Sequence, residues 1–225
     1  DRAGNCAAGV AEDGFWGIDT SAPGAPGPVT SSSHDPAGTP VADSTFDVAR
    51  GAASDGVSSV VSYDYAFDGS AGGSCTGGAS TASLTGASGA LADGSWYVHV
   101  CAVDAAGNRG EAVHGGPWIV DTAGPGGLSV ASSSHAVSTW SSDNTSDFGF
   151  SGASDANGVA GYAVAFDQAS GTVPGCAATQ STSSFTGSSS PDGDSWWIHV
   201  RAVDAAGNCG EAAHLGPFWI DTTAP

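Results

Sequence analysis

The 225-residue chain has no lysine and no methionine, and four arginines are its only permanently cationic side chains. Against them stand 23 acidic residues, which give a formal net charge of -19. A protein of this charge repels polyanions, so nucleic acid and anionic membrane surfaces are disfavoured as partners. Nearly all of the acids are aspartate, a residue typical of turns and of loops that bind hard cations. The charge therefore favours cations as partners.

Long apolar runs and helical periodicity are also missing. No run approaches the roughly 18 apolar residues that a bilayer-spanning helix needs, so we expect no direct membrane insertion. The chain is rich in Gly (35) and contains 11 Pro. No long stretch repeats apolar residues at helical spacing, so the composition predicts an all-β fold. Ser, His and Asp are plentiful but stand in no nucleophile-elbow, paired-acid or phosphate-loop context, so we expect no catalytic residues and no enzyme.

One phrase occurs almost three times along the chain. The segment Ser95 to Asn108 returns as Ser195 to Asn208, and the opening residues Asp1 to Cys6 match Asp204 to Cys209 at all but one position. A period near 100 residues is typical of a tandem array of small domains. We expect residues 1–23 to be the C-terminal strand segment of a preceding repeat. Residues 24–123 and 124–225 are each expected to form one complete β-sandwich repeat.

Each complete repeat contains two cysteines, which predicts one disulfide per repeat. The pairs are Cys75 with Cys101 and Cys176 with Cys209. Cys6 aligns with Cys209, so its partner would belong to a preceding repeat and we expect it to be unpaired within this chain. Disulfides indicate an oxidising compartment, which means an extracellular or cell-surface location. Position 101 and the position of Arg109 would face each other across one hairpin, so that either could reach the first cysteine.

The segment from Trp96 to Val103 alternates two sets of side chains, as a half-buried strand does. Arg201 occupies in the second copy the place of Cys101 in the first, and a lone buried Arg is too costly. We therefore expect the face with Trp96, Val98, Val100 and Ala102 to point inward. The bridge from Cys101 would then tether residues 69–78 over the outside of the sheet.

Histidines fall on the predicted outer face. His99 and His199 are explained by outward strand positions, and pairing with His114 or His214 would supply only two ligands, which is weak for a zinc site.

Residues 104–108 follow this strand and precede another, so they predict a hairpin loop in which Gly107 takes a left-handed conformation. The other predicted strands cover residues 46–48, 60–67 and 81–85, with counterparts at 148–150, 161–166 and 182–186. Short strands separated by turns at this spacing favour a two-sheet sandwich.

The pattern Trp-x-Val-x-Val-x-Ala-Val-Asp-x-x-Gly-Asn, preceded by Ser54-Asp55 and by strands such as residues 161–167, resembles fibronectin type III and bacterial immunoglobulin-like repeats. The closing residues 214–225 are similar to the repeat ends of large bacterial surface proteins. The resemblance covers the whole chain. It implies seven-stranded sandwiches strung along an extracellular fibre, without catalytic residues. The cysteine pair in each repeat departs from ordinary fibronectin type III domains.

A calcium site is the candidate metal site. In a sandwich of this topology, the loop with Asp55 or Asp155 and the hairpin after the long strand lie where the preceding linker arrives. Three carboxylates, an Asn carbonyl and backbone oxygens would suit the six to eight oxygen ligands of Ca²⁺. Turn chemistry is the competing explanation, since Asp opens and Gly-Asn closes a tight turn without metal. The candidate ligands are Asp19, Asp55, Asp104 and Asn108 in one set, and Asp121, Asp155, Asp204 and Asn208 in the other.

These features together predict structural modules of a long extracellular fibre, sheath or filament, whose partners are neighbouring repeats or identical subunits. The alternative is an adhesin-type binding module, in which an outer stripe of Trp, Tyr and His contacts glycans or cell surfaces. In a third arrangement, residues 1–23 would complete a sandwich in a neighbouring chain by strand addition. Calcium is the one candidate cofactor.

Overall fold

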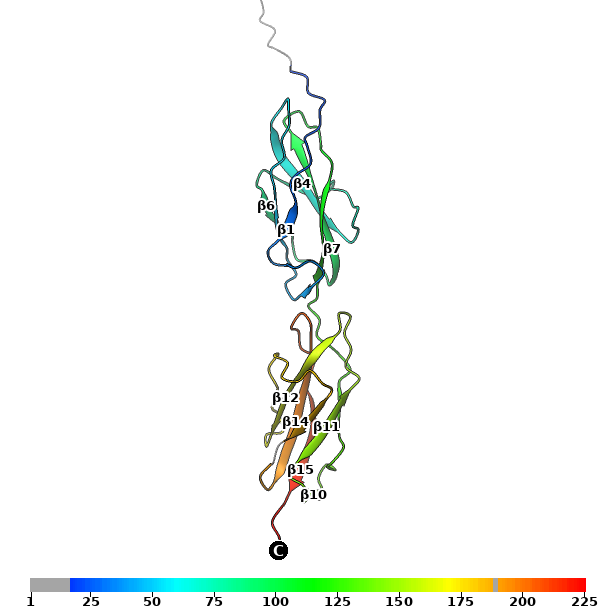
Figure 1. The fold of residues 1–225 in the computed structure, drawn as a ribbon, viewed down its shortest axis with the longest axis vertical. Coiled ribbons are helices and arrows are strands. Elements are labelled where there is room, and N and C mark those ends of the chain that lie inside the picture. Colours follow the sequence, from blue (N-terminus) through cyan, green and yellow to red (C-terminus); the bar gives the residue numbers. More distant parts are fainter. Residues whose placement is uncertain (1–16, 188–189) are drawn as a thin grey trace, which may run out of the picture.

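A computed structural model describes residues 17–187 and 190–225 (Figure 1). The predicted unpaired Cys6, and with it most of segment 1–23, lies outside the described residues. Throughout the described part of the chain the regular elements are β-strands, which confirms the all-β prediction. In the same residues, no helix is long and apolar enough to cross a membrane.

The first repeat folds into two facing sheets. Its smaller sheet has the order β1-β3-β6 and its larger sheet the order β2-β8-β7-β4-β5. All pairs are antiparallel except β2 with β8. The strands are β1 (Val29–Ser31), β2 (Pro40–Val41), β3 (Asp47–Arg50), β4 (Val60–Asp68), β5 (Ala79–Thr81), β6 (Thr85–Ala87), β7 (Gly94–Asp104) and β8 (Val113–Val120).

The second repeat has the same plan. Its sheets have the orders β13-β11-β9 and β10-β15-β14-β12. Again only the short strand, β10 with β15, pairs in parallel. The strands are β9 (Ser129–Ser132), β10 (Trp140–Ser141), β11 (Ser146–Ser151), β12 (Val159–Asp167), β13 (Ser184–Gly187), β14 (Gly193–Asp204) and β15 (Ala213–Ile220).

The cores lie between the two sheets and use the predicted face of the long strand. Val98, Val100 and Ala102 are fully buried, and their counterparts Ile198, Val200 and Ala202 are too. Phe46, which directly precedes β3, and Phe148 of β11 contribute aromatic rings from the side of the smaller sheet. Phe46 lies 5.4 Å from Trp118, and Phe148 lies 5.4 Å from Phe218, measured between ring centroids. Burial of these alternating side chains sets which face of each strand points inward.

The predicted strand over residues 81–85 is wrong as one element. β5 ends at Thr81 in the larger sheet, and β6 begins at Thr85 in the smaller one. Between them the Ser83 hydroxyl accepts a hydrogen bond from the Thr85 backbone N–H, a local turn that carries the chain from one sheet to the other. In the second repeat the larger sheet keeps only an isolated bridge between Tyr162 and Gln180 at this edge. The period-2 pattern continues through both halves and so cannot reveal the switch.

Disulfides join Cys75 to Cys101 and Cys176 to Cys209, with Cα atoms 5.8 and 5.5 Å apart. The expected facing of positions 101 and 109 is off by two residues, because Arg109 forms a bridge with Val103. Position 109 is therefore a diagonal neighbour of position 101, which explains how a cysteine at either place can serve the same purpose. In the second repeat, Arg201 stands in place of Cys101 and donates hydrogen bonds to the carbonyls of Gly210 and Pro174.

The two repeats lie end to end, so the molecule is elongated, and the chain enters and leaves each sandwich at opposite ends (Figure 1). Each repeat therefore adds its own length to the rod.

Candidate functional site

The junction between the repeats begins on the first repeat. The backbone N–H of Asp121 donates to the carbonyl of Val41 at 3.0 Å. The next residue, Thr122, donates from its N–H and its hydroxyl to Asp93, at 3.0 and 2.8 Å. The first two linker residues after β8 are thus fixed to the first repeat by hydrogen bonds.

The second repeat also forms hydrogen bonds with the residues of this linker. The side-chain amide of Asn208 donates to the carbonyl of Asp121 at 2.7 Å and to that of Ala123 at 3.4 Å. Directly after Pro125, Gly126 exchanges both backbone hydrogen bonds with Ser154, at 2.9 and 3.0 Å. Asp121 is therefore hydrogen-bonded to both repeats, and no free linker separates them.

Glycines allow this close contact. A Cβ on Gly124 would collide with the carbonyl of Cys209, and one on Gly210 with the carbonyl of Pro125. The upstream counterpart Gly110 lies in the same way against Pro23. The sequence did not predict these glycines as contact points, nor the contact of Thr122 with Asp93. Their recurrence in both repeats was the available signal, but Gly is too frequent in this chain for it to stand out.

The hairpin that carries Asn208 is built by local hydrogen bonds. The Asp204 carboxylate accepts from the Asn208 backbone N–H at 2.8 Å and from its side-chain amide at 2.9 Å. Gly207 adopts the predicted left-handed conformation with φ of 88°, as Gly107 does with φ of 90° in the first repeat. In the first repeat, Asn108 correspondingly donates to Asp104 and to the carbonyl of Asp19.

Three carboxylates converge at each linker. The ligand oxygens of Asp121, Asp155 and Asp204 all lie within 4.8 Å of one another, and so do those of Asp19, Asp55 and Asp104. We call these groups the junction triplet and the upstream triplet. Asp121, Asp104 and Asp204 are at most 2% exposed, whereas Asp155 is partly exposed. The six predicted aspartates are thus brought together in two sets of three, each with one Asp from a linker, one from a loop and one from a hairpin.

Asn108 and Asn208 act as hydrogen-bond donors at the junctions, not as the metal ligands that the sequence predicted. Their carbonyl oxygens were candidate ligands, but each side-chain nitrogen is the atom that approaches the triplet and the linker. The Asn208 amide donates to the carbonyls of Asp121 and Ala123 and to the Asp204 carboxylate, which fixes its orientation. Asn108 and Asn208 therefore clasp the linker and the hairpin carboxylate.

Burial and charge both act on the linker carboxylate. Burial raises the pKa of Asp121, and the nearby charges of Asp155 and Asp204 raise it further. Hydrogen bonds from Asn157 and Ala123 oppose this shift only in part. One oxygen of Asp121, Oδ2, is buried without a hydrogen-bond partner, and Oδ2 of Asp19 is in the same state.

The histidines form a second repeated cluster. His99 faces outward from the core as predicted, yet it is completely buried, and so is His199. The expectation of an open outer stripe is therefore wrong at these two positions. Residues 69–78 cover the first of them, since a Cβ on Gly73 would collide with the His99 ring. The Nδ1 atoms of His99 and His114 lie 2.6 Å apart, as do those of His199 and His214, which is hydrogen-bonding distance.

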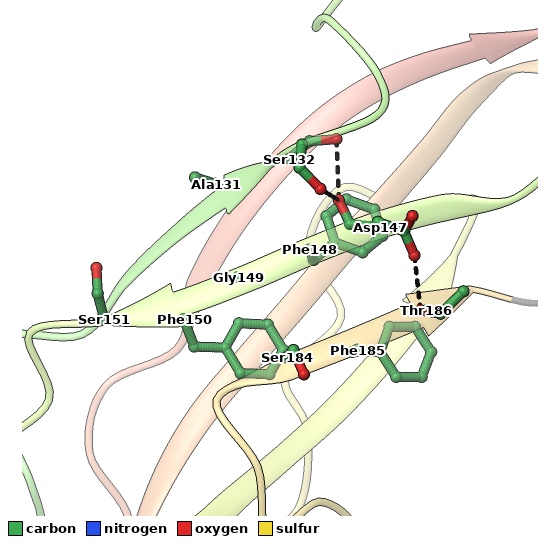
Figure 2. A pocket seen from close by; sticks show the side chains of 11 residues that line it. Ala131, Ser132, Asp147, Phe148, Gly149, Phe150, Ser151, Ser184, Phe185 and Thr186 are labelled. Carbon is green, nitrogen blue, oxygen red and sulfur yellow. Dashed lines mark hydrogen bonds between the residues drawn. The ribbon is translucent and has the colours of Figure 1, made fainter.

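A shallow hollow lies on the outer face of the smaller sheet of the second repeat (Figure 2). It is lined by small residues together with Asp147 and the phenylalanines of β11 and β13. Within the sheet, Thr186 donates to the Asp147 side chain at 2.6 Å, and Ser132 donates to the Asp147 carbonyl at 3.3 Å. The first repeat has an equivalent hollow around Asp47. Nothing about either hollow selects a ligand.

No family model and no curated protein matches the chain. Among solved structures it is similar to the fibronectin(III)-like modules of Clostridium thermocellum CbhA. The identity is 13%, the match covers 86% of this chain and 95% of that one, and the TM-score is 0.43.

It is also similar to chitinase ChiA74 from Bacillus thuringiensis, at 12% identity and a TM-score of 0.35, over 92% of this chain and 29% of the chitinase chain. A third similarity is to domains FN1-FN3 of chicken CNTN1, at 15% identity and a TM-score of 0.36, over 85% and 65% of the two chains. By their strand orders, the described residues form two tandem β-sandwiches of the immunoglobulin-like fold, which fibronectin type III modules share.

Proposed function

We propose that the chain forms spacer modules of a long extracellular or cell-surface fibre, whose partners are the neighbouring repeats. The main support for this proposal is the junction between the repeats. There the Asp121 N–H donates a hydrogen bond to the first repeat, and the Asp121 carbonyl accepts one from the second repeat. Flexible tandem domains are usually joined by exposed linkers with few contacts across them. The arrangement here supports a stiff connection that keeps the repeats in line.

Cysteine usage supports the proposed location. Two disulfides in one chain are typical of proteins exposed to an oxidising environment. In each repeat the bridge fastens an irregular segment across the outer face of the larger sheet. This protects an exposed rod from local opening, because the bridge limits how far the covering segment can separate.

Small-angle X-ray scattering and spin-label distances between the repeats test the proposal. The parent chain is expected to give one narrow distance distribution across the junction. Asn208→Ala removes the clasp at Asp121 and is expected to broaden it. Asn108→Ala is the matched control, because it removes the same clasp at Asp19 and leaves this junction intact. A broad distribution in the parent chain itself would refute a stiff spacer.

One observation favours the alternative of a binding module. Trp140 is 57% exposed, and its ring lies 5.5 Å from that of Trp219 on the second repeat. The first repeat has Pro40 and Ile119 at these positions, so the fold does not require the pair. Exposed Trp rings stack on sugar faces, which makes a glycan the candidate ligand. Binding to a glycan array that Trp140→Ala abolishes would support this function, and an array without signal would exclude the tested glycans.

A further inference from the structure

The junction triplet and the upstream triplet contain more oxygen atoms than their turns need. Oδ1 of Asp155 accepts from the backbone of Asn157 at 2.7 Å, and Oδ1 of Asp55 accepts from Val57 and Ser58, both at 2.8 Å. Oδ1 of Asp19 accepts from Ser21 at 2.9 Å. Turn chemistry therefore accounts for one oxygen of Asp19, Asp55 and Asp155, and hairpin hydrogen bonds account for both oxygens of Asp104 and Asp204. It gives no reason for three carboxylates from three separate segments to meet.

The buried carboxylate of Asp121 in the linker is the stronger indication of a bound ion. Asp121 is 2% exposed, and its Oδ2 has no hydrogen-bond partner, although it belongs to a group whose oxygens lie within 4.8 Å of one another. A buried oxygen without a partner is costly in a folded protein. A cation among the three carboxylates would supply the missing partner.

No arginine of the described residues supplies that positive charge. Arg109 is paired with Asp64, and Arg201 binds backbone carbonyls beside Gly210 and Pro174. Arg50 lies in the core of the first repeat over the Tyr63 ring. Three carboxylates this close repel one another in the folded state, so a bound cation would also relieve this repulsion.

The donor set determines the class of ion. Each triplet offers carboxylate oxygens and contains neither His nor Cys. The carbonyl of each linker Asp accepts from the same Asn amide that donates to the hairpin carboxylate. Oxygen ligands on irregular loops suit calcium, whereas zinc prefers nitrogen and sulfur and magnesium demands a strict octahedron. We propose that each triplet binds one calcium ion, so that the ion joins the linker Asp to the loop and hairpin of the following repeat. This inference rests on the proposed spacer function and names the ion that locks its junctions.

Calorimetric titration of the full chain with calcium chloride tests the site directly. We expect two ions per chain, with dissociation constants of roughly 0.1–1 mM, as in other extracellular calcium modules. Asp121→Asn is expected to leave one ion per chain, and magnesium chloride is expected to bind more weakly. Asp221→Asn is the matched control. Asp221 begins the same Asp-Thr-x-x-Pro segment and forms the same turn with Thr223, but it is exposed and belongs to neither triplet.

Thermal unfolding gives a second signature, one that a purely structural Asp would not produce. In chelator, Asp121→Asn is expected to unfold at a higher temperature than the parent, because it removes a buried charge. In 10 mM calcium, a concentration that is about 10-fold or more above the expected constant, the order is expected to reverse. Absence of calcium binding, or equal binding by the parent and Asp121→Asn, would overturn the proposal. A narrow distance distribution that persists in chelator would leave the spacer function standing even then.

Discussion

The two disulfides differ in how accessible they are, and this predicts the order in which a reductant opens them. Cys75, within the covering segment 69–78 of the first repeat, is 4% exposed, and its partner Cys101 is 2% exposed. Cys176 is exposed and Cys209 is partly exposed. Thiol exchange requires direct attack on a sulfur atom, so its rate depends on access. Under native conditions, a mild reductant is expected to open Cys176–Cys209 first.

The cost of that reduction follows from the length of the closed loop. The second bridge joins residues 33 apart, for which the chain-entropy model gives about 3.7 kcal/mol of stabilisation. For a domain of about 100 residues this corresponds to a fall of roughly 15–20 °C in the midpoint of unfolding. The first repeat should keep its midpoint, because its bridge remains closed.

Calorimetry and mass spectrometry after alkylation check this prediction in a Cys6→Ser background, so that every labelled thiol comes from a bridge. The partly reduced chain should carry label on Cys176 and Cys209 and show one displaced transition. The Cys176→Ala/Cys209→Ala variant should show the same displacement without reductant. Labelling of Cys75 or Cys101 first, or a displacement below about 5 °C, would refute the reasoning from access and loop length.

Three further predictions concern the junction, the core and the response to pH. Gly210→Ala should force the linker away from the hairpin and broaden the spin-label distances, whereas Gly175→Ala, which has open space around it, should not change them. Ile198→Ala should lower the free energy of unfolding of the second repeat by about 2–5 kcal/mol, measured in urea. Substitution of the exposed Val173 by Ala should lower it by less than about 0.5 kcal/mol. Equal losses for the two variants would contradict the assignment of Ile198 to the core. Burial lowers the pKa of His199, and the charge of His214 adds to this while Asp167 opposes it. As the pH falls, His199 is therefore protonated in the unfolded chain before it is protonated in the folded one. The stability of the second repeat should be full above the ordinary pKa of histidine and should be lost as the pH falls from that value through the lowered pKa of the folded state. His199→Gln should flatten this dependence between pH 8 and 5, and an unchanged slope would rule out His199 as its source.

One inference from the sequence succeeded at one arginine and would have failed at another. The cost of a lone buried Arg correctly placed Arg201 on the outer face. Arg50 nevertheless lies in the core, 6% exposed, with its guanidinium 4.5 Å from the centre of the Tyr63 ring. The ring attracts the cation and the aliphatic stem packs with apolar neighbours, which offsets part of the cost. Whether a suitable ring faces a given Arg depends on the packing of two sheets, which a strand pattern does not specify.

The sequence by itself determined the features that local periodicity and repetition encode. The alternation around Val98 and Val100 identified the inward face, the recurrence of the same phrase identified the repeats, and the paired cysteines indicated the bridges. These properties depend on residues close in the chain or on comparison of the copies.

Only the tertiary structure decided how segments far apart in the chain meet. It showed that His99 is covered, that the chain changes sheet between Thr81 and Thr85, and that Asn208 holds the linker by its amide nitrogen. It also brought Asp121 within reach of two aspartates from other segments. The physical reason is that register, sheet changes and loop packing depend on contacts between distant residues, and a single sequence does not list those contacts.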